Sequence, residues 1–194
     1  GLRGLRGAIM TVGLDHLTRA KIEAYIASRE LQREFPGALG YGFIRRVAPD
    51  QVESFVAAAK ADGAPNFAIR ELSPNQGERY VIQYIYPQAF NQAAVGLDIA
   101  SEASRRDAAI AAAQTSQAKL TAPLTLVQAN GSPRRGFLIL LPVYPKLTPL
   151  TADARQAQVV GWSYAPLVVD DVLADLGQLM DDVQIKLTDL IEVE

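Results

Sequence analysis

The chain has 194 residues, of which 49% are hydrophobic and 21% are charged, and its formal net charge is −2. This length suffices for one domain or for two small domains that share a core, and so small a net charge gives no strong field to attract nucleic acid or an acidic membrane surface. Cysteine is absent and His16 is the only histidine, which excludes disulfides, zinc–thiolate sites and cysteine nucleophiles and argues against a Ser–His–Asp triad. The sequence has no run of about 18 apolar residues, so no segment of it is predicted to span a bilayer.

The first part of the chain, residues 2–34, has no proline, and its glycines all lie before residue 14. Apolar residues recur there at helical spacing, with Arg, Lys and Glu between them, at Leu5, Ile9, Val12, Ile22, Tyr25 and Ile26. The pattern predicts one long amphipathic helix, in which Gly13 is the expected place for a break. The helix should end before Pro36, because proline disfavours helix in the residue that precedes it. Such a helix can be a stalk or a dimer seam, or it can pack on its own domain.

The rest of the chain alternates between strand-like and helix-like segments. Strands are expected at 40–44, 67–70, 80–86, 95–99, 120–128, 137–144, 159–164 and 183–189. Helices are expected at 50–59, capped by Asp50, at 101–113, capped by Ser101, and at 172–180. Asn130-Gly131 predicts a hairpin turn, and Pro123 implies a bend or an edge position within 120–128. Helices inserted between antiparallel strands indicate an α+β fold.

A lone carboxylate, Asp98, lies within the apolar run from residue 93 to residue 100. A buried carboxylate is costly unless it is hydrogen-bonded or paired, so a ligand that offers N–H groups is one way to satisfy it. The alternative is a structural bond to the neighbouring backbone or to Arg105. A single acid among strands rich in Leu and Val suggests a pocket for a small ligand. A catalytic centre would need a partner group that the sequence does not show.

Six segments, taken together in their order and spacing, resemble CHASE domains: ELQREFPGALGYGFIRRV, VIQYIYP, VGLDIASEASRRDAAIAAA, KLTAPLTLVQ, GFLILLPVY and GWSYAPLVVDDVL. The resemblance extends from about residue 20 to residue 190. It implies an extracytoplasmic sensor domain of a bacterial receptor, related to the sensor domain of plant cytokinin receptors, at the periplasmic face of the inner membrane. Two transmembrane helices are then expected to flank the domain in the full-length protein, with a histidine kinase or a nucleotide cyclase inside the cell. The domain itself is expected to be a sensor and not an enzyme.

The resemblance also implies the architecture, which in the family is a stalk helix followed by two PAS-like subdomains with antiparallel sheets. We therefore expect a stalk helix at 1–34, a membrane-distal ligand-binding subdomain at 35–144, and a membrane-proximal subdomain at 145–194 that is completed by residues from earlier in the chain. The implied partners are a small-molecule ligand, with adenine-type or cytokinin-like molecules among the candidates, and a second copy joined through the N-terminal helix. The alternative function is a structural or dimerisation module without a ligand of its own. Neither a cofactor nor nucleic acid is expected.

The resemblance assigns ligand contacts to particular residues. Leu97-Asp98 matches the Leu-Asp motif that supplies the ligand-binding acid in cytokinin receptors, and Leu120 matches a leucine whose backbone meets the adenine-like ring. Thr115 aligns with a threonine on which ligand binding depends in that group, although a structural role at a helix end is favoured for it here. Asn130 stands near the position of a threonine that contacts the ligand tail in those receptors.

Other candidates come from the pattern of the residues. Tyr80, Tyr84 and Tyr86 alternate along one strand, so we expect them to share a face that lines the pocket or belongs to the core. Gly161 either allows close packing or keeps the floor of the pocket open. Leu120 is a core residue if it does not meet a ligand. The acidic pairs towards the C-terminus are interpreted as solvated helix termini, so no metal site is predicted.

Overall fold

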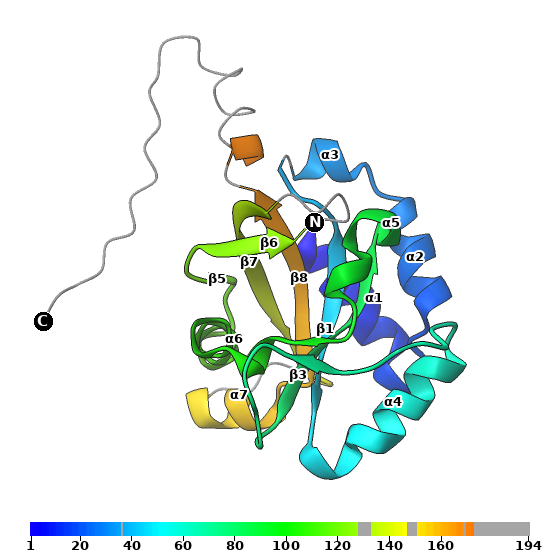
Figure 1. Cartoon of the computed structure of the whole chain (residues 1–194), viewed down its shortest axis with the longest axis vertical. Helices are drawn as coiled ribbons and strands as arrows, with labels where there is room; N and C mark the ends of the chain where they lie inside the picture. The colour runs from blue at the N-terminus through cyan, green and yellow to red at the C-terminus, as the bar shows by residue number, and fades with distance from the viewer. Residues whose placement is uncertain (36, 128–132, 147–150, 169, 173–194) are drawn as a thin grey trace, which may run out of the picture.

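The computed structural model describes residues 1–35, 37–127, 133–146, 151–168 and 170–172. They form one eight-stranded sheet with helices on both faces (Figure 1). The strands are β1 (Tyr41–Val47), β2 (Arg70–Glu71), β3 (Arg79–Tyr86), β4 (Leu97–Asp98), β5 (Lys119–Leu120), β6 (Leu124–Val127), β7 (Pro133–Val143) and β8 (Gly161–Val168). Their order is β2-β4-β3-β1-β8-β7-β5, with β6 paired to β7. Every described pair is antiparallel except β2–β4. The predicted α+β class is confirmed.

The long strands lie where apolar and β-branched residues predicted them, because each is covered on both faces. All residues of β8 are buried, and β3 is buried along most of its length. The expected strand at 120–128 is divided into β5 and β6, with the break at Pro123. Proline has no N–H to donate to a ladder, so it ends the pairing of β5 with β7 before β6 begins.

The residues of the predicted helix at 2–34 form separate elements instead of one helix. These are α1 (Leu2–Val12), the 3-10 turn η1 (Leu14–His16), α2 (Arg19–Ala27) and α3 (Leu31–Glu34). Gly13 has a φ of 76° and ends α1, at the position where a break was expected. The hydroxyl of Thr18 then caps α2 by accepting from the backbone N–H of Lys21 at 3.4 Å. Residues 2–34 are therefore not one continuous helix.

The apolar face of this N-terminal segment packs on the chain's own sheet. Leu5, Ile9, Ile22 and Ile26 are almost fully buried, in a cluster with Tyr41 and other side chains from β1, β7 and β8. In Figure 1, α1 and α2 lie on one side of the sheet and α6 and α7 on the other. The packing on its own domain, left open by the sequence, is therefore the arrangement observed.

The opposite face of the sheet is covered by α6 (Ala103–Thr115), next to α7 (Ala152–Gln158). Ala109, Ala112 and Ala113 have no exposed surface, and their small side chains let the helix lie close to the strands. The indole Nε1 of Trp162 donates to the carbonyl oxygen of Ala109 at 3.0 Å, and the hydroxyl of Tyr144 donates to that of Ala113 at 2.6 Å. β8 and the residue that follows β7 therefore hold α6 through its backbone.

The cap of α6 differs from the prediction. The carboxylate of Glu102 accepts from the backbone N–H groups of Ser104 and Arg105, each at 3.0 Å. Ser101, the expected cap, instead donates to the carbonyl of Asp98 at 2.5 Å and accepts from the N–H of Leu72 at 2.9 Å. A carboxylate satisfies two N–H groups of the first turn at once and complements the positive end of the helix dipole.

The remaining elements connect the strands. They are the 3-10 turns η2 (Pro49–Gln51), η3 (Gln92–Ala94) and η4 (Ile99–Ser101) and the helices α4 (Val52–Ala61) and α5 (Gln88–Asn91). α4 packs with Phe67 and Val81 in a small core of its own.

β8 lies between β1 and β7 in the middle of the sheet. Residues 161–168, assigned by the sequence to a membrane-proximal subdomain at 145–194, therefore belong to the same sheet as the strands of 35–144. β8 is buried on both faces, so both of its edges need a strand partner. These partners are β1 and β7, which both come from residues 35–144. Residues 170–172 are helical, whereas the rest of the helix expected at 172–180 and the strand at 183–189 lie outside the described residues.

Candidate functional site

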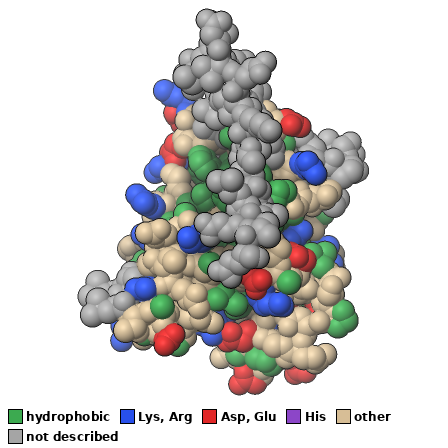
Figure 2. All heavy atoms as spheres, turned by 90° about the vertical axis from the view of Figure 1, so that its left-hand side faces the viewer, with side chains coloured by type: hydrophobic (Ala, Val, Ile, Leu, Met, Phe, Trp, Pro, Cys, Tyr) green, Lys and Arg blue, Asp and Glu red, His purple; other side chains and the backbone are tan. Residues whose placement is uncertain are grey.

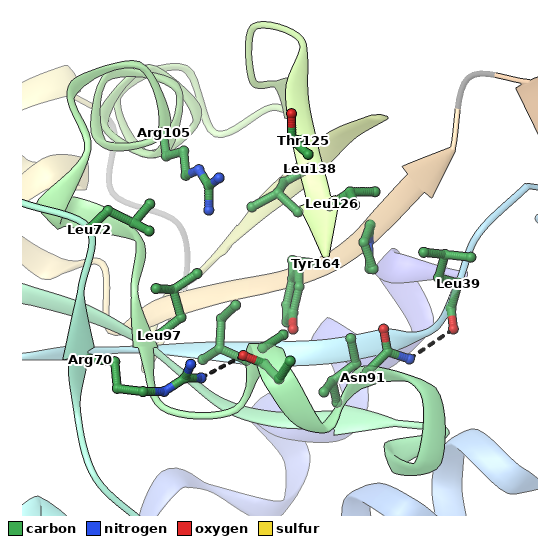
Figure 3. Close-up of a pocket in the computed structure, with 15 residues that line it drawn as sticks. Leu39, Arg70, Leu72, Asn91, Leu97, Arg105, Thr125, Leu126, Leu138 and Tyr164 are labelled. Carbon is green, nitrogen blue, oxygen red and sulfur yellow. Dashed lines mark hydrogen bonds between the residues drawn. The ribbon is translucent and has the colours of Figure 1, made fainter. Parts of the chain in front are cut away.

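A cavity of about 270 Å³ lies on the face of the sheet that carries α6. It is bounded by β3, β7 and β8 below, by the β6–β7 hairpin on one side, and by α5, η3, β4 and the start of α6 on the other (Figure 3). The residues that line it are Leu39, Arg70, Leu72, Ile82, Ile85, Asn91, Ala93, Ala94, Leu97, Arg105, Thr125, Leu126, Leu138, Tyr164 and Pro166. Residues from nine helices, turns and strands meet here with two loop residues, Leu39 and Leu72, so the site depends on the whole fold.

The walls of the cavity are mostly apolar. Ile82 and Leu138 reach it from neighbouring parts of the sheet and are 2% and 3% exposed. Leu97 from β4 and Leu126 from β6 face one another across it (Figure 3). A largely apolar, partly open space with a few polar groups is the usual form of a small-molecule site.

The position of β4 depends on Gly96. This residue has a φ of +85°, and a Cβ atom there would lie 2.2 Å from the carbonyl oxygen of Ala68. Its N–H donates to the carbonyl of Ile82 at 2.8 Å and its own carbonyl accepts from the N–H of Arg70 at 2.9 Å. Glycine is therefore required for the chain to pass between β3 and β2 and to bring Leu97 to the cavity.

Two polar side chains at the cavity already have partners within the chain. Nη2 of Arg70 donates to the carbonyls of Ala93 and Val95 at 2.5 and 2.8 Å. Nδ2 of Asn91 donates to the carbonyls of Leu39 and Pro87 at 3.1 and 2.9 Å. Both side chains hold the irregular backbone around η3 in place, since those carbonyls have no strand partner to satisfy them.

Two other polar groups lack hydrogen bonds. The side chain of Arg105 is 13% exposed, its Nε is buried without a hydrogen-bond partner, and its nearest acid, Glu102, lies 3.6 Å away with 37% of its side chain exposed. The hydroxyl of Tyr164 is also buried without a partner. Burial lowers the pKa of Arg105 and raises the pKa of Tyr164 well above its usual value. Figure 3 shows the guanidinium of Arg105 extending from α6 into the cavity.

The carboxylate of Asp98 lies beside the cavity but does not line it. Its Oδ1 accepts from the N–H groups of Tyr80 and Ala100 at 2.8 and 3.0 Å, and its Oδ2 accepts from Nδ2 of Asn75 at 2.9 Å. The guanidinium Nε of Arg79 is 3.9 Å from Oδ2. Asp98 therefore makes the structural hydrogen bonds to neighbouring backbone that were expected from the sequence as the alternative to ligand binding. Arg105, the other structural partner considered, does not bond to it. Leu97, the other half of the Leu-Asp pair, does line the cavity.

The chain matches the family model of the CHASE domain over residues 15–194. It belongs to the CHASE domain family. CHASE domains are extracytoplasmic sensor domains of signalling receptors, and they are sensory and not catalytic. None of the curated proteins compared with the chain gives a match.

In the described part of this CHASE domain, no helix has the length and apolar character needed to cross a bilayer. Nor do three or more His, Cys, Asp or Glu side chains gather there in a way that would hold a metal ion.

The tyrosines of β3 do not share a face. Between β1 and β3 the register shifts, so that Phe43 faces Tyr84 while Ile44 faces Ile82, and Gln83 is left as the extra residue of a β-bulge. A bulge reverses which face the following side chains point to. Tyr80 therefore lies on the α6 face, 4.5 Å from the ring of Trp162.

Tyr84 lies on the opposite face, in the cluster around α1 and α2. Its hydroxyl donates to Oδ2 of Asp62 at 2.7 Å, and burial raises its pKa. Both Tyr80 and Tyr84 are core residues of the CHASE domain, and neither lines the cavity.

Leu120, Thr115 and Gly161 also lie away from the cavity. Leu120 is 51% exposed, which corrects its expected place in the core, and β5 pairs it with Ile139 at the edge of the sheet. The hydroxyl of Thr115 donates to the carbonyl of Ala111 at 2.7 Å, a helix-end role. A Cβ atom at Gly161 would lie 2.2 Å from the carbonyl oxygen of Ile44, so this glycine allows close packing. Asn130 lies outside the described residues.

Sequence reasoning missed the two unpartnered polar residues of the cavity. From the sequence, Arg105 was considered only as a partner for Asp98, although its spacing along the helix could have indicated that it is buried. It precedes Ala109 and Ala112 by four and seven residues, which places an arginine on the buried alanine face of the helix. Nothing in the sequence distinguished Tyr164 from the other core tyrosines.

Proposed function

We propose that this CHASE domain senses a small molecule that binds in the cavity beneath α6, in a receptor held in the membrane by flanking transmembrane helices. The observation that carries the proposal is a cavity with apolar walls and two buried polar atoms without a hydrogen bond, the guanidinium Nε of Arg105 and the hydroxyl of Tyr164. Leaving such groups unpaired costs free energy. A ligand that supplies the missing partners recovers that cost, so the cavity favours occupation.

The route by which binding changes the rest of the receptor is proposed to be β8. Tyr164 of this strand lines the cavity, while the hydroxyl of Ser163 donates to the carbonyl of Leu2 in α1 at 3.1 Å on the other face. A ligand that binds one position of β8 better than another shifts the population of α1 as well. The output is then a histidine kinase or a nucleotide cyclase on the cytoplasmic side, with the N-terminal helices of two copies side by side.

The proposal places the ligand at Arg105 and Tyr164, whereas the family resemblance points to an adenine-type ligand held by Asp98. That alternative ligand needs the Asp98 carboxylate to exchange a hydrogen bond from Asn75 or the backbone for one from the ligand. The two assignments make different predictions for variants. Arg105→Gln should weaken binding of a ligand held at Arg105 and leave binding of an adenine-type ligand held by Asp98 nearly unchanged.

A thermal-shift screen of small metabolites tests the proposal. A ligand present at 100 times its dissociation constant adds about 2.7 kcal/mol to the free energy of unfolding. Ala94→Phe, which fills the cavity at η3, should remove the shift, while Ala157→Phe on the exposed surface of α7 should keep it. A compound that stabilises both variants equally binds elsewhere and argues against this cavity.

The second candidate function is a dimerisation module without a ligand of its own. It has less support, because the apolar residues of α1 and α2 are used within the chain's own core. If the screen gives no stabilising compound and the domain dimerises at micromolar concentration in analytical ultracentrifugation, this second function replaces the first.

A further inference from the structure

The charged side chains that line the cavity are positive. Two arginines line it, and no Asp or Glu is among the described residues that do. Arg70 is exposed and its Nη2 is bound to two carbonyls, whereas Arg105 is largely buried and its Nε has no hydrogen bond, so Arg105 is the cation that gains more from an anionic partner. Its five N–H donors form a planar fork that matches the two oxygens of a carboxylate.

Glu102 does not neutralise Arg105 fully. Both of its carboxylate oxygens accept backbone N–H bonds at the start of α6, and Oε2 is 3.6 Å from Nε of Arg105 without forming a hydrogen bond. The Glu102 side chain is 37% exposed and its carboxylate is shared with the backbone of the first turn, so its pairing with Arg105 is partial. The guanidinium thus keeps a positive charge in an apolar site. An anionic ligand that pairs with it there stabilises the complex strongly.

The positive charge is local to the cavity. On the face shown in Figure 2, Lys and Arg side chains lie interspersed with Asp and Glu side chains, and the whole chain has a net charge of −2. An anion is therefore not drawn to a broad basic surface but is selected where Arg105 meets the cavity. The remaining walls, formed by Leu97, Leu126 and Leu138, require that the rest of this anion be apolar.

We propose that the ligand of this cavity is a small monocarboxylate with an apolar aromatic or aliphatic body, its carboxylate paired with Arg105 and its body packed between β4 and the β6–β7 hairpin. This inference rests on the proposed function and names its ligand class. The hydroxyl of Tyr164 supplies one further hydrogen bond to a polar atom of the ligand. A cation is excluded by Arg105, and a neutral ligand leaves the guanidinium with its 3.6 Å contact to Glu102 and no anion of its own in the cavity.

Isothermal titration calorimetry with four acids, hexanoate, benzoate, phenylacetate and indole-3-acetate, each beside its neutral primary amide, tests the ligand class. At least one acid should bind the wild type about tenfold more tightly than its amide, as expected for the loss of one charge-assisted pair. Arg105→Gln should remove this preference without weakening the amide. Arg3→Gln, the same change on the exposed side of α1, should keep it. Thermal unfolding checks that each variant is folded.

The other outcomes separate the ligand class from the proposed function. Amides that bind as tightly as their acids, or an acid preference that survives in Arg105→Gln, overturn the monocarboxylate assignment. If none of the four acids binds and the metabolite screen finds neutral compounds that Ala94→Phe excludes, the cavity is a ligand site for another class. If no compound binds at all, both the ligand class and the proposed function fail.

Discussion

Asp98 and Tyr80 are joined across the edge of the sheet by a hydrogen bond from the N–H of Tyr80 to the buried Oδ1 of Asp98, at 2.8 Å. The same oxygen accepts from the N–H of Ala100 at 3.0 Å. β4 pairs with β3 at a single residue pair, Val81 and Asp98, so this carboxylate replaces the missing ladder bonds. A residue that the sequence marks as a ligand contact therefore holds the cavity wall together.

Asp98→Ala should lower the free energy of unfolding by about 3 kcal/mol. The substitution leaves two buried backbone N–H groups without an acceptor, and the Asn75 amide keeps only its bond to the carbonyl of Glu78. Each unsatisfied group costs about 1–3 kcal/mol less any rescue by water. Urea denaturation followed by circular dichroism measures the change. Asp107→Ala, an exposed site on α6, is the control and should change stability by less than about 0.5 kcal/mol. A similar small change at Asp98 would show that its bonds are not structural.

Tyr164→Phe and Tyr144→Phe should act in opposite directions. The hydroxyl of Tyr164 is buried without a partner, so its removal should leave stability unchanged or raise it by up to about 1 kcal/mol. The hydroxyl of Tyr144 donates to the carbonyl of Ala113 at 2.6 Å, so its loss should cost about 1 kcal/mol.

Chemical denaturation of the two variants side by side measures this pair, because each substitution removes one oxygen and no packing volume. Loss of stability in Tyr164→Phe comparable to that in Tyr144→Phe would mean that the Tyr164 hydroxyl has a partner in the free protein. The proposal that a ligand supplies that partner would then lose its support.

The fold class and the long strands could be predicted from the sequence because their signals are local. β3 is a run of β-branched and aromatic residues, β8 has the aromatic residues Trp162 and Tyr164 near its start, and the break at Pro123 follows from its missing N–H. The division of the N-terminal segment at Gly13 was also visible. Its packing on the sheet was not, since an amphipathic face does not reveal which surface will cover it.

The candidate site was less predictable, because it depends on register and long-range contacts. The alternation of Tyr80 and Tyr84 predicted a shared face, but the bulge at Gln83 reverses it. Asp98 was correctly seen as a buried carboxylate in need of partners, and those partners come from β3 and from Asn75, which is 23 residues away. A cavity assembled from many elements leaves no contiguous pattern in the sequence.

Gly96→Ala should destabilise the domain by more than about 2 kcal/mol and abolish ligand binding in the cavity. A Cβ atom there would lie 2.2 Å from the carbonyl of Ala68, at a φ of +85°, so β4 has to move. Gly7→Ala is the matched control, because it lies exposed within α1 with nothing within 4 Å of its Cβ position. It should stabilise the helix by about 0.5–1 kcal/mol. Thermal unfolding of both variants measures the difference, and equal behaviour would show that the turn at Gly96 tolerates a side chain.

Stability should fall steeply as the pH rises from about 10 to about 12. Burial, with a further contribution from the nearby Glu34 carboxylate, raises the pKa of Tyr41 to about 12, while the same side chain in the unfolded chain ionises near 10. Between these values the unfolded state has lost a proton that the folded state still holds, so the contribution of Tyr41 is full below pH 10 and declines by about 1.4 kcal/mol per pH unit above it. Urea titrations at pH 8, 10 and 11 measure the slope. In Tyr41→Phe, which cannot ionise at this position, the free energy of unfolding should fall less steeply with pH, by about 1.4 kcal/mol per pH unit. A slope identical to that of the wild type would show that Tyr41 ionises as readily in the folded protein as in the unfolded one.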